Sequence, residues 1–84
     1  MQTVKVFDTR VEAPGRRLHF DVITTDEATA VTLANAYVSA QGYPSVTVTA
    51  EHCQFCHAEP LLMFSEPQQK EFRETGGFIV PLSL

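Results

Sequence analysis

Basic residues are scarce in this sequence, and their scarcity excludes several classes of partner. Six Lys and Arg residues stand against ten Asp and Glu residues, which gives a formal net charge of −4. Nucleic acids and anionic membranes are bound through basic surfaces that displace their counterions. We therefore expect no nucleic-acid partner and no membrane partner.

Long apolar runs and targeting segments are also lacking. The longest apolar run, Leu-Leu-Met-Phe at residues 61–64, is far shorter than the roughly 20 residues that span a bilayer. The first ten residues, MQTVKVFDTR, contain neither the apolar segment nor the cleavage site that directs secretion. These absences predict a cytoplasmic protein, in which thiols are kept reduced.

What is present is the composition of one small folded domain. The chain has 84 residues, of which 44% are hydrophobic and 19% are charged. A disordered chain would contain fewer apolar residues and a larger charge imbalance. No repeat, low-complexity segment or linker divides the sequence, so residues 1–84 are predicted to form a single domain.

Alternating apolar and polar residues predict four strands. Three of them lie at residues 3–9, 17–23 and 45–51, and residues 77–84 form the last, with Pro81 indicating a sheet edge. Between the first two, Pro14 and Gly15 occupy the positions that a type II turn favours. The first two strands should therefore form a hairpin.

Two helices are predicted between the later strands. The first covers residues 24–42, with Thr24 as its cap, and the second covers residues 65–77, with Ser65 and Gln68 as a capping box and Gly76 at its end. One face of the first helix is apolar. Its members are Ala30, Leu33, Ala34, Tyr37 and Val38.

The predicted fold is an α+β domain in the order β-β-α-β-α-β. Because a right-handed crossover makes the second and third strands parallel, we expect a mixed four-stranded sheet with two helices on one face. Strand alternation then places His19, Asp21, Phe7 and Ile23 on the open face. The apolar pair Phe7 and Ile23 suggests a homodimer through this open sheet face, although scattered exposed apolar residues are common.

Four stretches carry a resemblance to a known family: VFDT (residues 6–9), LHFDV (18–22), CQFCHAE (53–59) and GGFIV (76–80). In these stretches and their order the chain resembles a family of small, mostly bacterial single-domain proteins of unknown function, number twenty twenty-four among such families. The resemblance covers nearly the whole chain. It implies a single α+β domain and no known activity, cofactor or catalytic residue.

The stretch EHCQFCHAEP, residues 51–60, is the most distinctive chemical feature. Its two cysteines, Cys53 and Cys56, have the spacing that lets two thiolates bind one zinc ion, or less commonly iron. A metal site there would be completed by His57 or His52, with His19 or Glu59 as further candidates. No second C-x-x-C is present to supply the remaining ligands.

Other interpretations of this stretch remain open. The pattern Cys53-x-x-Cys56-His57 also matches haem attachment, but that chemistry normally accompanies export. A thiol redox pair normally has its first cysteine at a helix N-terminus, and no capped helix follows directly here. Alternatively the stretch is a structural connector, with Phe55 buried as its anchor and the cysteines packed as small apolar residues.

Catalytic motifs are absent from the sequence. A polar group formed by His19 and Asp21, with Asp8 or Thr9 nearby, could act as a base and its partner. No nucleophile elbow, phosphate loop or H-E-x-x-H motif accompanies it, so an enzyme is not the favoured interpretation. The sequence favours a small binding or regulatory module with a metal site, with a protein-interaction or self-association domain as the alternative.

Overall fold

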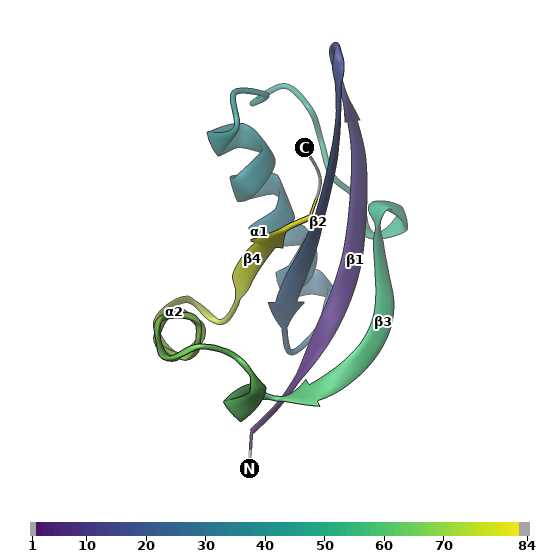
Figure 1. Cartoon of the computed structure of the whole chain (residues 1–84). Helices are drawn as coiled ribbons and strands as arrows, with labels where there is room; N and C mark the ends of the chain where they lie inside the picture. Colours follow the sequence, from purple (N-terminus) through teal and green to yellow (C-terminus); the bar gives the residue numbers. More distant parts are fainter. Residues whose placement is uncertain (1, 83–84) are drawn as a thin grey trace.

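The computed structural model describes residues 2–82 and has the predicted α+β element order (Figure 1). The strands are β1 (Thr3–Ala13), β2 (Arg16–Thr24), β3 (Cys53–Pro60) and β4 (Phe78–Pro81). The helices are α1 (Glu27–Ala40) and α2 (Glu66–Thr75), and two 3-10 turns, η1 (Ala50–His52) and η2 (Leu61–Met63), flank β3. Residues 83 and 84 of the predicted last strand lie outside the described residues.

The four strands form one antiparallel sheet in the order β3-β1-β2-β4. The predicted mixed sheet is therefore wrong. Because β2 and β3 each run antiparallel to β1, they do share a direction, as the crossover argument requires. However, β1 lies between them, so no two neighbouring strands are parallel.

The hairpin of β1 and β2 is the centre of the sheet and follows the prediction. Ala13 pairs with Arg16 across a two-residue turn, and Gly15 has a φ of 70°, which L-residues with a side chain rarely adopt. The register continues without interruption from this turn to the pair of Lys5 and Thr24. This continuous register fixes which side chains share a face.

The third strand lies later in the chain than predicted. Residues 46–49 are irregular, and the strand begins at Cys53. The side chain of Asn35 on α1 accepts a hydrogen bond from the Val48 backbone N–H at 2.8 Å and donates one to the Val48 carbonyl at 2.9 Å. These two bonds satisfy backbone groups that a strand partner would otherwise pair.

The cap of helix α1 lies two residues later than the proposed Thr24. Asp26 is the N-cap, and its carboxylate accepts the Thr29 backbone N–H at 2.8 Å. Thr24 is instead buried at the end of β2, where its hydroxyl donates to the Gly76 carbonyl at 2.6 Å. The apolar helix face is confirmed, with Ala30 and Ala34 fully buried.

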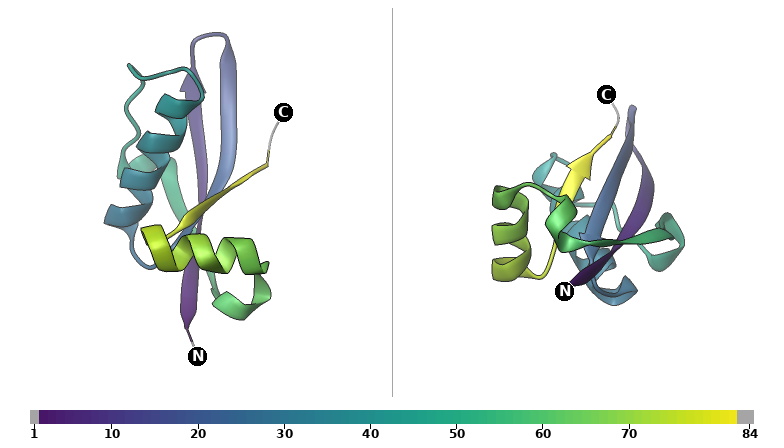
Figure 2. Two further views of the ribbon diagram at one scale, coloured as in Figure 1. Left: turned by 90° about the vertical axis from the view of Figure 1, so that its left-hand side faces the viewer. Right: turned by 60° about the horizontal axis from the view of Figure 1, so that its bottom comes forward.

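Helix α2 is capped as predicted but is weakly buried. Ser65 and Gln68 form the capping box, and Gly76 ends the helix with a φ of 88°. None of its side chains is buried, and Phe72 is the apolar residue through which it contacts the core. Figure 2 shows α2 lying across one end of the hairpin, on the opposite side of the molecule from β3.

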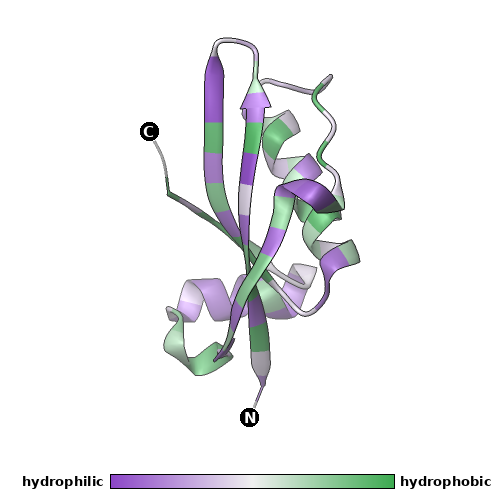
Figure 3. Cartoon of the chain, turned by 90° about the vertical axis from the view of Figure 1, so that its right-hand side faces the viewer, coloured by the Kyte–Doolittle hydropathy of each residue, from purple (hydrophilic) through white to green (hydrophobic). Residues whose placement is uncertain are grey.

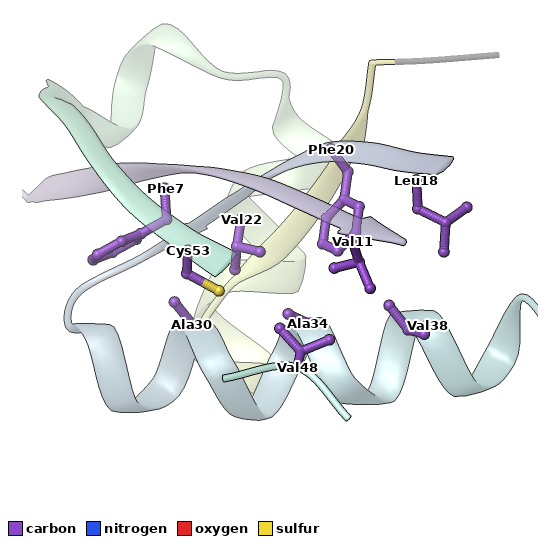
Figure 4. Packing of buried hydrophobic residues seen from close by; sticks show 10 residues of the cluster. All are labelled: Phe7, Val11, Leu18, Phe20, Val22, Ala30, Ala34, Val38, Val48 and Cys53. Atoms are coloured by element: carbon purple, nitrogen blue, oxygen red, sulfur yellow. The ribbon is translucent and has the colours of Figure 1, made fainter. Parts of the chain in front are cut away.

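The core consists of two clusters on opposite faces of the hairpin. Because Val6 pairs with Ile23 and the next pair is Phe7 with Val22, these two pairs point to opposite faces. The first cluster joins Phe7 and Val22 to α1 (Figure 4), and the second joins Val6 and Ile23 to Leu61 and Phe78, with Phe72 of α2 against it.

This division corrects two expectations about the sheet faces. The helices do not pack on one face, because α1 joins the first cluster and α2 contributes to the second. Phe7 and Ile23, expected on an open face, are only 3% and 1% exposed. The apolar residues that suggested a homodimer through that face are therefore inside the protein.

Candidate functional site

The cysteine–histidine stretch forms the edge strand β3. Its residues pair with β1 alone, from Thr3 opposite Pro60 to Thr9 opposite Cys53, so the other edge of the strand has no partner among residues 2–82. The register shifts between Val6 and Phe7, and Cys56 is the additional residue at this bulge. The distinctive stretch is thus a strand rather than the expected loop.

The two cysteines lie in different environments. Cys53 is 2% exposed, and Figure 4 shows its sulfur pointing toward α1 within the first cluster. Burial raises the pKa of the Cys53 thiol, and a hydrogen bond with the Thr9 side chain offsets only part of this effect. Cys56 is exposed. The motif therefore contains one buried thiol and one surface thiol.

Strand geometry also keeps these thiols apart. Three residues of extended chain span about 10 Å, whereas a disulfide needs Cα atoms within about 7 Å. Both cysteines are free. A redox pair, or a metal bound by both sulfurs, would require local rearrangement of β3.

The two histidines proposed as metal ligands have other partners. His52 Nδ1 accepts the Thr49 backbone N–H at 2.9 Å within the capping box of η1. His57 Nε2 lies 3.5 Å from a carboxylate oxygen of Glu59, on the exposed surface of β3. Across residues 2–82, no three His, Cys, Asp or Glu side chains are grouped as a metal ion requires.

Phe55 is not the buried anchor that the sequence suggested. It is 56% exposed, because it lies on the edge strand beyond the margin of the helix layer. Its ring meets the ring of Phe7 edge-on at a centroid distance of 6.0 Å, and Lys5 Nζ lies 6.0 Å from its centroid. Phe55 therefore belongs to the surface of the protein.

A polar cluster occupies the face that carries Val6 and Ile23, toward the hairpin turn. His19 Nε2 and an Asp8 carboxylate oxygen are 2.6 Å apart, so Asp8 across the hairpin is a partner of this histidine. Asp8 also lies 3.5 Å from Arg10 Nε. The register set by the two-residue turn places His19 opposite Arg10. Asp8 is two residues from Arg10 on the same face, so its contact with His19 is the diagonal contact expected across a hairpin.

Asp21 faces Asp8 directly across the two strands. Burial raises the pKa of the Asp21 carboxyl, and the nearby Asp8 charge raises it further, against the lowering effects of His19 and His57. The cluster thus brings one imidazole and two carboxyl groups together on one face of the hairpin. Its geometry supports no catalytic assignment.

The exposed apolar surface lies elsewhere, on η2 and beside α2. Leu62 and Met63 are 70% and 69% exposed, and Figure 3 shows η2 as a hydrophobic segment of the surface. Beside them is an open hollow of about 800 Å³, which we call the α2–η2 groove. It is lined by Leu62, Glu66, Pro67, Gln69, Lys70 and Arg73.

The basic residues of this groove have no acidic partner. In the described part of the chain, no ion pair within 4.0 Å joins Lys70 or Arg73 to a carboxylate. The sequence reasoning noted the apolar run at residues 61–64 but missed these two residues. Their three-residue spacing, which places both on one helix face, could have identified them.

Comparison with known proteins identifies the family of the chain. The model of the family "Domain of unknown function (DUF2024)" matches residues 1–82. The chain belongs to this family. A comparison with curated proteins found no match.

One solved structure is similar over almost the whole chain. It is the NMR structure of protein NE1680 from Nitrosomonas europaea, a structural genomics target, with 33% sequence identity and a TM-score of 0.79. The match covers 98% of this chain and 96% of that protein. That protein therefore shares this α+β fold, and neither its title nor the family description names an activity.

The described residues also contain no helix that is long and apolar enough to cross a membrane.

Proposed function

We propose that this DUF2024 domain is a protein-interaction module whose α2–η2 groove binds an acidic segment of another protein. The observation that carries the proposal is the combination of two highly exposed apolar side chains, Leu62 and Met63, with two cations that have no ion-pair partner among residues 2–82, Lys70 and Arg73. The expected ligand is a segment with an apolar anchor flanked by Asp or Glu.

The exposed apolar side chains at the groove support binding through burial: Leu62 lines the groove, and Met63 is the next residue of the same turn. Leu62 and Met63 stand on η2, while the neighbouring Leu61 is buried in the second cluster. The turn is therefore anchored by one leucine and presents the next two side chains to solvent. Covering such side chains gains roughly 25 cal/mol for each Å² of apolar surface removed from water.

The charges of the groove support an acidic ligand. The chain carries a net charge of −4, yet Lys70 and Arg73 line the groove together with a single carboxylate, Glu66. Complementary charge steers association and selects among partners. An acidic segment gains from both cations, whereas a basic segment meets their repulsion.

The weak burial of α2 fits the same function. None of the ten residues of this helix is buried, so most of its side chains remain available for a partner. The helix is held by its capping box and by a hydrogen bond from the Gln69 side chain to the Phe64 carbonyl at 2.8 Å. A ligand in the groove would add burial to the least buried helix of the fold.

The test uses a fluorescein-labelled peptide in which leucine pairs alternate with glutamate pairs, and a counterpart in which lysine replaces glutamate. Fluorescence polarisation should show tighter binding of the acidic peptide, weakened by added salt. The Lys70→Glu/Arg73→Glu variant should bind this peptide at least about tenfold more weakly. Leu62→Asp should also weaken it, because it removes the apolar contact.

The matched control is Arg16→Glu/Arg17→Glu, which makes the same change in net charge at the exposed hairpin turn. It should leave binding of the acidic peptide nearly unchanged. Circular dichroism of each variant reports whether the fold is intact. Equal binding of the two peptides, or equal losses in the groove and control variants, would contradict the proposal.

The metal site at Cys53, Cys56, His57 and His52 stays a prediction from the sequence, and the observed geometry gives it no support. The buried thiol of Cys53 supports the structural-connector interpretation for that residue alone, since Phe55 and Cys56 are exposed. A cytoplasmic location remains part of the proposal and is consistent with two free thiols.

A further inference from the structure

No strand within residues 2–82 pairs with the outer edge of β3, and five consecutive residues of this strand, 54–58, are exposed. Edge strands of this kind are templates for pairing with another chain. We propose that two copies of the protein pair antiparallel through β3, about a two-fold axis at Ala58. This inference is independent of the α2–η2 groove.

The hydrogen bonds of β3 with β1 determine which backbone groups point outward. The Leu61 backbone N–H donates to the Gln2 carbonyl at 2.8 Å, in the same register that pairs Glu59 with Val4 and His57 with Val6. In an antiparallel ladder, alternate residues direct both N–H and C=O to the same neighbouring strand. The intervening residues, Ala58 and Pro60, therefore direct these groups away from β1.

Ala58 is the position where a symmetric pairing can be centred. In a two-fold antiparallel pair, the residue on the axis faces its own copy, and its N–H and C=O bond to that copy. Pro60 has no N–H, while His57 and Glu59 direct their groups toward β1. Cys56 lies in the bulge, where the ladder is disrupted. Between the bulge and the end of β3, Ala58 is thus the outward-facing residue with both groups free.

The side chains beside this axis are complementary. Residues at equal distances from Ala58 lie opposite each other, so His57 faces Glu59 of the second copy, and the reverse pair forms by symmetry. Within one chain, His57 Nε2 is already 3.5 Å from the Glu59 carboxylate. Each carboxylate therefore comes to lie between two imidazoles. An imidazole N–H can donate to the facing carboxylate, and a protonated imidazole adds an ionic attraction, whereas like charges directly across a pair destabilise a sheet.

The small size of the Ala58 side chain allows a covalent test of this register. Residues directly opposite in a hydrogen-bonded pair have Cα atoms about 5.5 Å apart, which a disulfide spans. The Ala58→Cys substitution in a Cys56→Ser background should therefore form a disulfide-linked dimer under mild oxidation. Cys53 is buried and can remain in place. Glu74→Cys in the same background, on the exposed surface of α2, is the control.

The full-length variants are oxidised at equal concentration, and cross-linked dimer is followed on non-reducing gels. The Ala58→Cys protein should cross-link faster than the Glu74→Cys control. Adding Glu59→Lys should slow the cross-link about tenfold, and adding His57→Glu to that variant should restore it, because opposite charges then face each other again. Equal rates at the two cysteine positions, or no rescue by the second charge change, would overturn the pairing.

Wild-type protein provides a measurement without cysteine substitution. Sedimentation velocity should show a monomer–dimer equilibrium that Glu59→Lys shifts toward the monomer. Glu74→Lys makes the same change in net charge away from β3 and should leave the equilibrium unchanged. A monomer at every accessible concentration would overturn the proposal.

Discussion

Single residues of this protein owe their chemistry to the strand face on which they lie. Cys53 and Cys56 form one motif in the sequence, but strand alternation and the bulge place the first in the core and the second on the surface. Phe55, between them, has the same strand parity as Cys53 and lies opposite the buried Phe7, yet it is 56% exposed. Spacing alone identified the motif, but it could not give these environments, because they depend on the register with β1.

The first prediction is that the thiols differ in reactivity. An aromatic disulfide reagent should titrate about one thiol per folded chain, that of Cys56, because burial shields Cys53 and raises its pKa, which disfavours the reactive thiolate. Both thiols should react in denaturant. The Cys56→Ser variant should lose the fast-reacting thiol, and a chelator should leave reactivity and the unfolding midpoint unchanged.

Protection of both thiols in the folded protein would instead support the metal hypothesis. If both thiols were protected and a chelator released them together, they would have to share an ion. Elemental analysis for zinc and iron on the same sample would then identify it.

At the scale of elements, local signals predicted the hairpin, both helices and the cap of α2, because turn and cap chemistry lies within a few residues. The third strand was misplaced because Val46 and Val48 alternate like a strand. Val48 does fill the core, but Asn35 on a distant helix takes the place of its strand partner. The true strand β3 buries one residue of eight, so it has almost no apolar pattern.

The second prediction concerns Asn35, whose side chain makes the two backbone hydrogen bonds to Val48 that a neighbouring strand would otherwise make. Asn35→Ala should lower the free energy of unfolding by about 1–3 kcal/mol, because it leaves the Val48 N–H and carbonyl without their partner. Urea unfolding measures the loss. Thr32→Ala, at an exposed position of α1, is the control and should cost less. Equal losses would mean that the Asn35 bonds contribute no more to stability than an exposed side chain of the same helix.

At the scale of the whole molecule, the hairpin is covered on its two faces by different elements. The face of Val6 and Ile23 is apolar at one end, under η2 and Phe72, and polar at the other, where Asp8, His19 and Asp21 lie. The α+β element order was predicted correctly from the sequence. However, the prediction placed both helices on one face of the sheet and left the other face open, whereas both faces of the hairpin carry a buried cluster. Alternation shows which residues of a strand share a face, but it cannot show which element covers each face or how far along the strand that cover extends.

This arrangement leaves a half-buried carboxylate, Asp21, opposite a second one, Asp8, and the last prediction concerns the resulting pH dependence. Because burial and the Asp8 charge raise the pKa of Asp21, the folded chain binds this proton more readily than the unfolded chain. The contribution of Asp21 to stability therefore increases as pH falls through its folded pKa, and it is unfavourable at neutral pH.

Asp21→Asn should accordingly stabilise the protein at pH 7, by roughly 0.2–1 kcal/mol once solvent screening is considered. The gain should vanish near the ordinary aspartate pKa of about 3.9 and below, where Asp21 is already protonated. Urea unfolding of both proteins across this pH range measures the difference. Asp26→Asn is a control of opposite sign, since the Thr29 N–H lowers the pKa of Asp26, whose charge stabilises the fold at neutral pH. A loss of stability in Asp21→Asn at pH 7 would mean that attraction from His19 and His57 outweighs burial and the Asp8 charge.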